Sequence, residues 1–261
     1  MGVLKSDAPQ WFLTSFVRSA VGAGATADTD TIEEMGQALL ERWSDENRHF
    51  HNLRHLAAVL HRVDQLAEET HEPDLVRLAA WYHGAVFSAD GKGADATQGA
   101  GSQGDASSAD GSQAGRPAGQ DDQLYGGEQS TESAVLAHDQ LTALGVPARA
   151  ADRVAALVNA IVRHAPNPAD FDAAVLNDAD LAMLAAEPQR YKEYKSAVRA
   201  EYGHVPTDVY LKARIHVVER LLARKSLFLS PMGAAWEEPA RQNLDMELHR
   251  LRKEQAKLDS V

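Results

Sequence analysis

The chain has 261 residues, of which 44% are hydrophobic and 25% charged, and its formal net charge is −12. This composition is typical of a soluble globular protein, and a negative charge without a basic cluster argues against a nucleic-acid-binding surface. The absence of cysteine excludes disulfide bonds and cysteine nucleophiles, and it leaves His and carboxylate side chains as metal ligands. No run approaches the roughly 20 apolar residues that a membrane span needs, and the first residues do not resemble a signal peptide. We therefore expect a cytoplasmic protein with no membrane partner.

Apolar residues recur at helical spacing along most of the chain, and no stretch alternates as a strand does. Thr31 and Glu34 have capping-box spacing at a helix start, Pro73 suits a first helical turn, and Gly145 begins a stop signal. The pattern predicts eight or nine helices, over about 31–43, 51–69, 73–83, 129–144, 154–164, 175–184, 191–202, 209–229 and 237–258. We expect one all-α domain, a helical bundle that spans residues 1–261.

Residues 88–127 interrupt this pattern. Ten of the 18 glycines of the chain fall in this stretch, and Leu124 and Tyr125 are its only large apolar residues. Such a segment cannot bury enough apolar surface to offset its ordering entropy. We predict a low-complexity, disordered insertion within the helical domain.

Two histidines, His51 and His55, are four residues apart, so on one helix they would lie one turn apart on the same face. The chain has no cysteine and no G-x-S-x-G motif. A hydrolase without such nucleophiles can use a water whose pKa a divalent ion lowers from about 15.7 towards 7. Imidazole and carboxylate ligands suit Mn, Fe, Zn or Co, and a helical bundle can bring such ligands together from separate helices.

Several short motifs resemble, in their order and spacing, those of the HD superfamily of metal-dependent phosphohydrolases, most closely an uncharacterised bacterial branch. The resemblance covers about residues 33–248 apart from the insertion. It rests on RHFHNLRHLAAVL (48–60), WYHGAVF (81–87), IVRH (161–164), LNDADLAML (176–184), YKEYKSAVRAEYGHV (191–205) and EEPARQNL (237–244).

The resemblance implies a small phosphorylated substrate, such as a nucleotide, and a divalent metal ion as cofactor. The metal ligands of the family are a His, then a His-Asp pair, then a distant Asp. Carried over to this chain, the ligands are His55, His83 and Asp180, with Asp178 as the alternative to Asp180. In cyclic-nucleotide phosphodiesterases of the superfamily, the first His of an H-N-x-x-H motif acts as general acid, which assigns that role to His51.

Further residues are candidates for substrate binding. His164 could contact a second metal or a phosphate, or it could be an ordinary histidine at a helix end. Arg199, Arg214 and Arg241 could hold a phosphate, because a guanidinium group matches it bidentately. The alternative is that these arginines form ion pairs, with acidic residues such as Glu201, Glu219 and Glu237.

The chain departs from the family where the Asp of the His-Asp pair is replaced by Gly84. One metal could remain on His55, His83 and Asp180, since three ligands with an open position suffice for a catalytic site. A carboxylate from Glu128, Glu132 or Asp178 could instead replace the missing ligand, or the site could be degenerate. In the last case the chain would be a module that binds a nucleotide or a protein partner without hydrolysis, or a purely structural helical protein.

Overall fold

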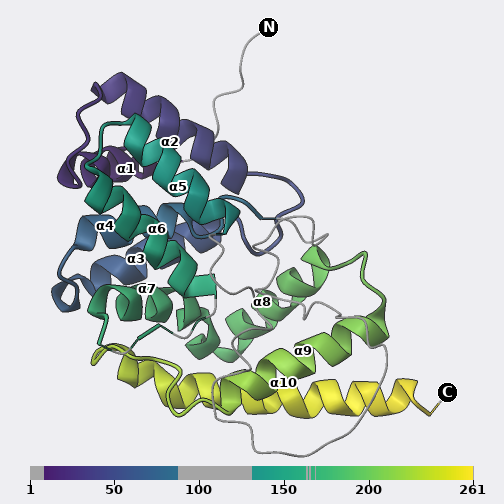
Figure 1. Ribbon diagram of the computed structural model, residues 1–261. Coiled ribbons are helices and arrows are strands. Elements are labelled where there is room, and N and C mark those ends of the chain that lie inside the picture. Colours follow the sequence, from purple (N-terminus) through teal and green to yellow (C-terminus); the bar gives the residue numbers. More distant parts are fainter. Residues whose placement is uncertain (1–8, 88–130, 163, 165, 168, 261) are drawn as a thin grey trace, which may run out of the picture.

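The computed structural model describes residues 9–87, 131–162, 164, 166–167 and 169–260 (Figure 1). These residues form α-helices and short 3-10 turns, with no β-strand among them. The α-helices are α1 (Trp11–Gly22), α2 (Thr29–Trp43), α3 (Leu53–Gln65), α4 (Pro73–Tyr82), α5 (Glu132–Ala143), α6 (Ala148–Val162), α7 (Phe171–Leu181), α8 (Pro188–Glu201), α9 (Thr207–Leu222) and α10 (Glu237–Leu258). The prediction of an all-α fold is confirmed, while the predicted disordered insertion lies outside the described residues.

The helices pack around two main cores. The larger core takes buried apolar side chains from α1 to α7, and a second core is shared by the end of α7 and α8, α9 and α10. In Figure 1, α10 runs along one side of the molecule, at the opposite end from α1 and α2. Trp236 packs against both cores. Two residues of the site described below lie where the two groups of helices meet. Asp180 is the next-to-last residue of α7, and Glu201 is the last residue of α8.

Local signals explain several helix ends. Pro73 occupies the first turn of α4, as predicted, and Gly145 follows α5 with a φ of +75°, a conformation that favours glycine. The final predicted helix, 237–258, coincides with α10. These boundaries could be predicted because single residues with strong conformational preferences determine them.

Other boundaries differ from the prediction. The patch around Trp11 forms the helix α1, and α2 is capped by Asp28, which accepts a hydrogen bond from the backbone N–H of Thr31 at 2.8 Å. The helix expected over 209–229 ends at Leu222. A short loop follows it. The backbone N–H of Leu227 in this loop donates hydrogen bonds to both carboxylate oxygens of Glu237, the first residue of α10.

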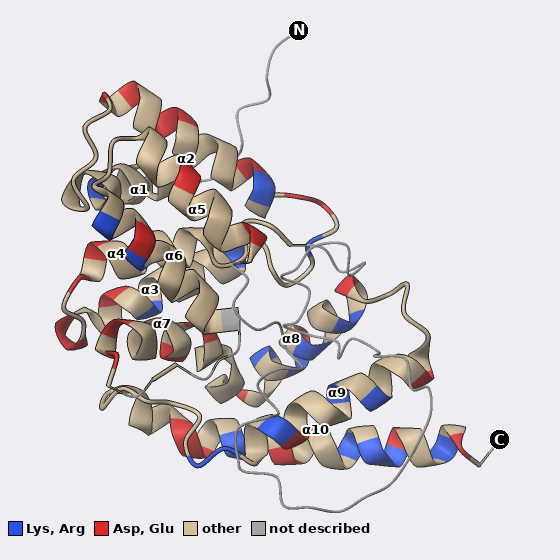
Figure 2. Cartoon of the chain, viewed as in Figure 1, with Lys and Arg blue, Asp and Glu red and all other residues tan. Residues whose placement is uncertain are grey.

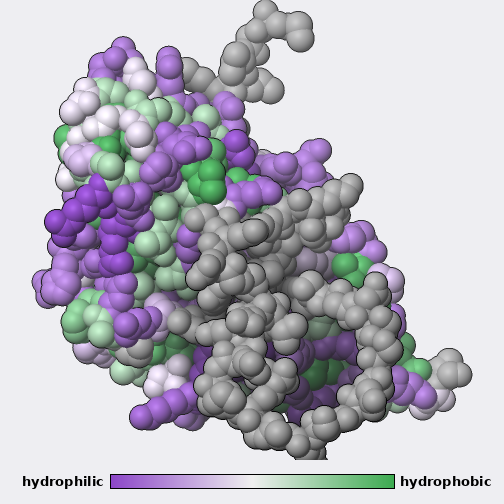
Figure 3. Space-filling model, in the orientation of Figure 1, coloured by the Kyte–Doolittle hydropathy of each residue, from purple (hydrophilic) through white to green (hydrophobic). Residues whose placement is uncertain are grey.

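Within the described ranges, no helix has both the length and the apolar character that crossing a bilayer requires. The visible hydrophobic areas are small and separated by hydrophilic residues (Figure 3). The large exposed apolar residues are scattered over several helices and one loop: Trp11, Val21, Val135, Phe171, Met232, Met246 and Leu258.

Candidate metal centre

The start of α3 sets the positions of the two neighbouring histidines. Asn52 caps the helix, and its side-chain oxygen accepts hydrogen bonds from the backbone N–H groups of Arg54 at 2.9 Å and His55 at 3.4 Å. His55 therefore lies in the first turn, while His51 precedes the helix. The expectation that both histidines share one helical face is wrong, because the cap falls between them. Their rings still approach each other, with centroids 5.5 Å apart.

Three side chains from three separate places in the sequence converge on one point. Nε2 of His55 lies 3.1 Å from Nε2 of His83 and 3.1 Å from Oδ1 of Asp180, and Nε2 of His83 lies 3.5 Å from the same Oδ1. We call these three residues the His–His–Asp cluster. It is the group among the described residues whose ligand atoms could hold a metal ion. These separations would allow His55, His83 and Asp180 to hold one ion at the usual ligand distances of about 2.0–2.2 Å.

The backbone fixes the tautomer of His83. Its Nδ1 lies 2.6 Å from the carbonyl oxygen of Ala80, one turn earlier at the end of α4. A carbonyl oxygen can only accept a hydrogen bond, so Nδ1 carries a proton and donates it. In the neutral ring, Nε2 then presents its lone pair to the cluster. This is the arrangement in which histidines bind metals, with the other ring nitrogen held by a hydrogen bond.

The electrostatics of the cluster favour a bare carboxylate and a neutral imidazole. Burial lowers the pKa of His55, against the opposing effect of Asp180. Burial alone would raise the pKa of Asp180, but the adjacent imidazoles of His55 and His83 bring it well below its usual range. The cluster thus brings unshared electron pairs of nitrogen and oxygen atoms close together in a buried place, with few protons between them. A cation bound there would offset the repulsion between these electron pairs.

His51 belongs to a second buried arrangement beside the cluster. Its Nδ1 lies 2.8 Å from Oε2 of Glu201, and Oε1 of Glu201 accepts hydrogen bonds from the backbone N–H groups of Phe50 at 2.8 Å and His51 at 2.7 Å. These bonds and the His51 ring lower the pKa of Glu201 in spite of its burial. The His51 ring also stacks on Phe87, with centroids 4.5 Å apart. Glu201 was expected only as an ion-pair partner for arginine, because nothing in its sequence neighbourhood shows that it meets a histidine 150 residues away.

His164 lies at the far side of Asp180. Its Nε2 is 3.6 Å from Oδ2 of Asp180, the oxygen that faces away from the two other histidines. Burial lowers the pKa of His164 to about 4, and its buried Nδ1 has no hydrogen-bond partner in the described structure. Its backbone has a φ of +45°, which is rare for a residue with a side chain, and Arg224 donates a hydrogen bond to its carbonyl oxygen.

The other carboxylates considered as ligands do not join the cluster. Both oxygens of Asp178 accept hydrogen bonds from the backbone of Leu229, and one also from that of Ser230, all at 2.7–2.9 Å. Asp178 therefore anchors the loop before α10. Glu132 is exposed in the first turn of α5, and Glu128 lies outside the described residues.

The candidate phosphate-binding arginines are engaged elsewhere. Arg199 donates to the carbonyl oxygens of Tyr202 and Val205, just past the end of α8. Arg241 forms an ion pair with Glu237 at 2.7 Å and donates to the carbonyl oxygen of Leu222 at the end of α9. Neither has a hydrogen bond or ion pair to the His–His–Asp cluster among the described contacts.

Arg214 is paired inside the second core. Its Nε lies 2.8 Å from Oε1 of Glu247, and its Nη2 lies 3.1 Å from Oε2 of the same residue. Of the ion-pair partners considered from the sequence, Glu237 is the one that meets a candidate arginine, while Glu219 pairs with Arg252.

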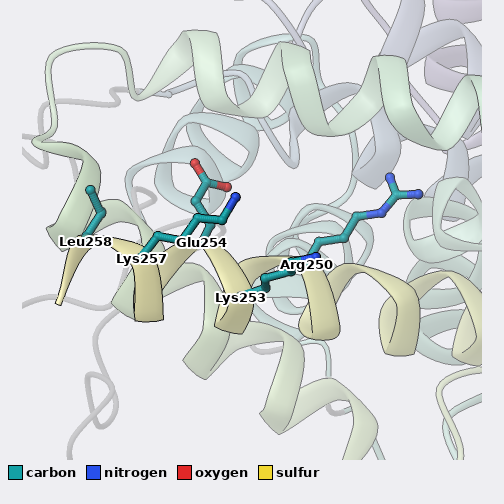
Figure 4. Close-up of a pocket in the computed structure, with 5 residues that line it drawn as sticks. All are labelled: Arg250, Lys253, Glu254, Lys257 and Leu258. Atoms are coloured by element: carbon teal, nitrogen blue, oxygen red, sulfur yellow. The ribbon is translucent and has the colours of Figure 1, made fainter. Parts of the chain in front are cut away.

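A surface pocket on α10 lies far along the chain from the His–His–Asp cluster. It is lined by Arg250, Lys253, Glu254, Lys257 and Leu258 on the C-terminal half of α10 (Figure 4). Basic side chains outnumber acidic ones along this part of the helix (Figure 2). The pocket shares no residue with the His–His–Asp cluster.

Comparisons of the chain with protein-family models, with curated proteins and with solved structures give no match. The functional interpretation therefore depends on the geometry of the cluster and on the motifs of the sequence.

Proposed function

We propose that the protein is a metal-dependent hydrolase of a small phosphoester, such as a nucleotide. The observation that carries this proposal is the convergence of the ligand atoms of His55, His83 and Asp180, with 3.1–3.5 Å between them, in a buried place. Three protein ligands leave an open position for water or substrate, as in catalytic metal sites. The phosphoester as substrate is supported by the resemblance of the motifs to the HD superfamily.

The donor set fits a divalent transition metal. Two imidazole nitrogens and one carboxylate oxygen suit Mn, Fe, Zn or Co better than Mg, which prefers oxygen ligands alone. Such an ion, when bound, polarises a phosphoryl oxygen and lowers the pKa of a coordinated water. The hydrogen bond from Nδ1 of His83 to Ala80 keeps the Nε2 lone pair of His83 directed at the ligand position.

His51 is the proposed proton donor to the leaving oxygen. Its Nδ1 is held by Glu201, so proton transfer to substrate uses Nε2. The carboxylate of Glu201 is buried and its pKa is lowered, so it stays ionised and accepts the hydrogen bond that orients the ring of His51. Glu201 thus acts through His51, as a positioning residue.

The proposal does not require the arginines. Arg199 and Arg241 bind backbone carbonyl groups, and their assignment to substrate remains a prediction from the sequence. His164 is the better-placed candidate for a phosphate or metal contact, because its Nε2 already lies near Asp180.

The direct test combines metal analysis with an activity assay. We expect the purified protein to contain a stoichiometric divalent metal, and we expect phosphatase or phosphodiesterase activity that rises with added Mn²⁺ or Co²⁺. The variant His55→Ala should lose both, while His61→Ala, which removes an exposed histidine from the same helix, should retain both. Full activity in His55→Ala would refute the proposal.

A second function is favoured by one observation, the absence of a side chain at Gly84, where the family has a metal ligand. The chain could then use its helical shell to bind a nucleotide without hydrolysis. This alternative predicts no stoichiometric metal, and a rise in melting temperature when a nucleotide is added in the presence of EDTA, because a ligand that binds only the native state stabilises it.

A further inference from the structure

Arg48 is a buried charged residue that the proposed function does not use. It lies in the segment between α2 and α3 and is 9% exposed. Burial lowers the pKa of Arg48 to about 10, against the opposing effect of Asp45 and Glu201, so its guanidinium group is protonated at pH 7. Burying a charge is costly unless the charged group is hydrogen-bonded. The groups that Arg48 contacts therefore indicate its role.

The guanidinium group joins two separate segments of the site. Nη1 of Arg48 donates to the carbonyl oxygen of His51 at 3.3 Å and to that of Gly84 at 2.7 Å. Nη2 donates to the carbonyl oxygen of Ala85 at 3.2 Å. His51 precedes α3, whereas Gly84 and Ala85 form the turn that follows His83 at the end of α4. One side chain thus ties the segment of the proposed proton donor to the turn after a proposed metal ligand.

Two aromatic rings lie against the same guanidinium group. The guanidinium carbon of Arg48 is 5.3 Å from the ring centroid of Trp43 and 5.5 Å from that of Phe87, distances typical of cation–π contacts. Trp43 is fully buried and packs against Gly84, and Phe87 stacks on the ring of His51 with centroids 4.5 Å apart. Arg48 is thus linked to His51 twice, through the carbonyl oxygen and through the segment that carries Phe87.

Other contacts position the proposed metal ligands. The hydrogen bond from Nδ1 to the carbonyl oxygen of Ala80 orients His83, and the capped first turn of α3 carries His55. His51 precedes that helix, so its position depends on contacts with other segments, one of which Arg48 provides. The loss of Arg48 should therefore displace the proposed proton donor more than the metal ligands.

We infer that Arg48 is a positioning residue that keeps His51 aligned with the metal centre, because one guanidinium group binds the backbone of His51 and the turn that leads to Phe87. The inference rests on the proposed function, in which His51 donates a proton. An arginine suits this role because its planar guanidinium group donates several hydrogen bonds in fixed directions, whereas a lysine ammonium is a point charge on a flexible stem.

Kinetics with two substrates test the inference. Arg48→Met removes the charge and the donors but keeps a long side chain. We expect kcat on an alkyl phosphoester, whose leaving oxygen needs a proton, to fall by about 10–100-fold, less than a complete loss of general acid catalysis can cost. On a p-nitrophenyl ester the loss should be much smaller, and Mn²⁺ should bind as tightly as to the wild type in equilibrium dialysis. Added methylguanidinium should restore part of the lost rate on the alkyl ester.

The control is Arg54→Met, which changes an exposed arginine in the first turn of α3 and should alter neither rate. Equal losses on the two substrates in Arg48→Met, or a loss of Mn²⁺ binding, would overturn the inference and leave the hydrolase proposal standing. A wild-type protein that neither binds Mn²⁺ nor hydrolyses a phosphoester would overturn both.

Hydrogen–deuterium exchange of metal-free protein tests the contacts of Arg48 without an activity assay. In Arg48→Met, the backbone amides of residues 49–55 and of residues 82–87 should both exchange faster, because both segments lose a shared donor. Arg48→Lys keeps the charge but not the planar group, so its exchange and its kcat should be intermediate, and it carries both tests if Arg48→Met does not fold. Faster exchange in only one of the two segments, or equally throughout the helices, would contradict the inference.

Discussion

Nδ1 of His51 is 2.8 Å from Oε2 of Glu201, and the same carboxylate accepts two backbone N–H groups beside His51. The end of α8 thus holds the imidazole next to the His–His–Asp cluster. A carboxylate that orients a histidine and balances its charge raises the effectiveness of that histidine as a general acid.

The first prediction concerns this pair. Glu201→Gln keeps the shape of the side chain but removes its charge, so we expect kcat to fall by about 100-fold on an alkyl phosphoester, within the range of general acid catalysis. On a p-nitrophenyl ester, whose leaving group needs no proton, the loss should be much smaller. Both substrates are measured in a steady-state assay with saturating metal.

The control for this experiment is Glu193→Gln, which changes an exposed residue of the same helix. It should leave both rates unchanged. Equal losses on the two substrates for Glu201→Gln would indicate a structural role for Glu201 instead of a role in proton donation.

The second prediction concerns stabilisation by metal. If Mn²⁺ binds only the native state, a concentration 100 times the Kd stabilises it by about 2.7 kcal/mol, which is about 5–11 °C in melting temperature for a chain of this size. Asp180→Asn should abolish this shift, whereas Asp152→Asn, at an exposed carboxylate on α6, should not. A differential scanning fluorimetry series with and without EDTA provides the measurement, and a shift that survives Asp180→Asn would place the ion elsewhere.

The third prediction concerns pH. Asp172 is buried, which by itself raises its pKa, but Arg153 and hydrogen bonds from Thr70, His71 and Glu72 together lower it below the usual value of 3.8. A carboxyl group whose pKa is lower in the folded state stabilises the fold above the unfolded pKa, and it loses this contribution as the pH falls through the folded pKa.

Asp172→Asn should therefore reduce the free energy of unfolding at pH 7 by about 1.5–3 kcal/mol, the range for hydrogen bonds to a charged group. The difference from wild type should shrink as the pH falls from 4 to 2. Urea unfolding at pH 7, 4 and 2 measures this difference, and a difference that does not depend on pH would contradict the assignment.

The fourth prediction concerns the ion pair within the second core. Side chains of Arg214 and Glu247 are 4% and 3% exposed, so removing one partner leaves a buried charge without its counterion. Glu247→Gln should lower the free energy of unfolding by about 3–5 kcal/mol. Glu219→Gln, which breaks the exposed pair with Arg252, should cost less than about 1 kcal/mol. Similar losses in the two variants, measured by urea unfolding, would show that burial does not set the cost.

The sequence could predict the helical fold and the ligand candidates because both depend on local patterns. The spacing of apolar residues predicted the all-α class, and the motifs around His55, His83 and Asp180 selected three residues that the structure brings together. The cap that separates His51 from α3 is also a local feature, since Asn52 is a common capping residue, but the spacing of the two histidines suggested a continuous helix.

Contacts between distant segments could not be predicted. The pairing of His51 with Glu201 and the packing of Trp43 against Gly84 each join positions far apart in the sequence, and neither residue type requires its partner. The partners of Arg199 and Arg241 could not be predicted either. A guanidinium group can donate hydrogen bonds to phosphate oxygens and to backbone carbonyl oxygens, so the residue type alone did not show which of these partners each arginine has.

One contact beside the cluster bears on how the chain can vary. The backbone N–H of Val86 donates a hydrogen bond of 3.1 Å to the side chain of Ser133, so the described residues just before 88 and just after 130 are tied to each other. The entropy of closing a loop between fixed ends grows only with the logarithm of its length. A change in the number of residues between these two tied positions should therefore cost the helical body little free energy, and it should leave the neighbouring histidines in place.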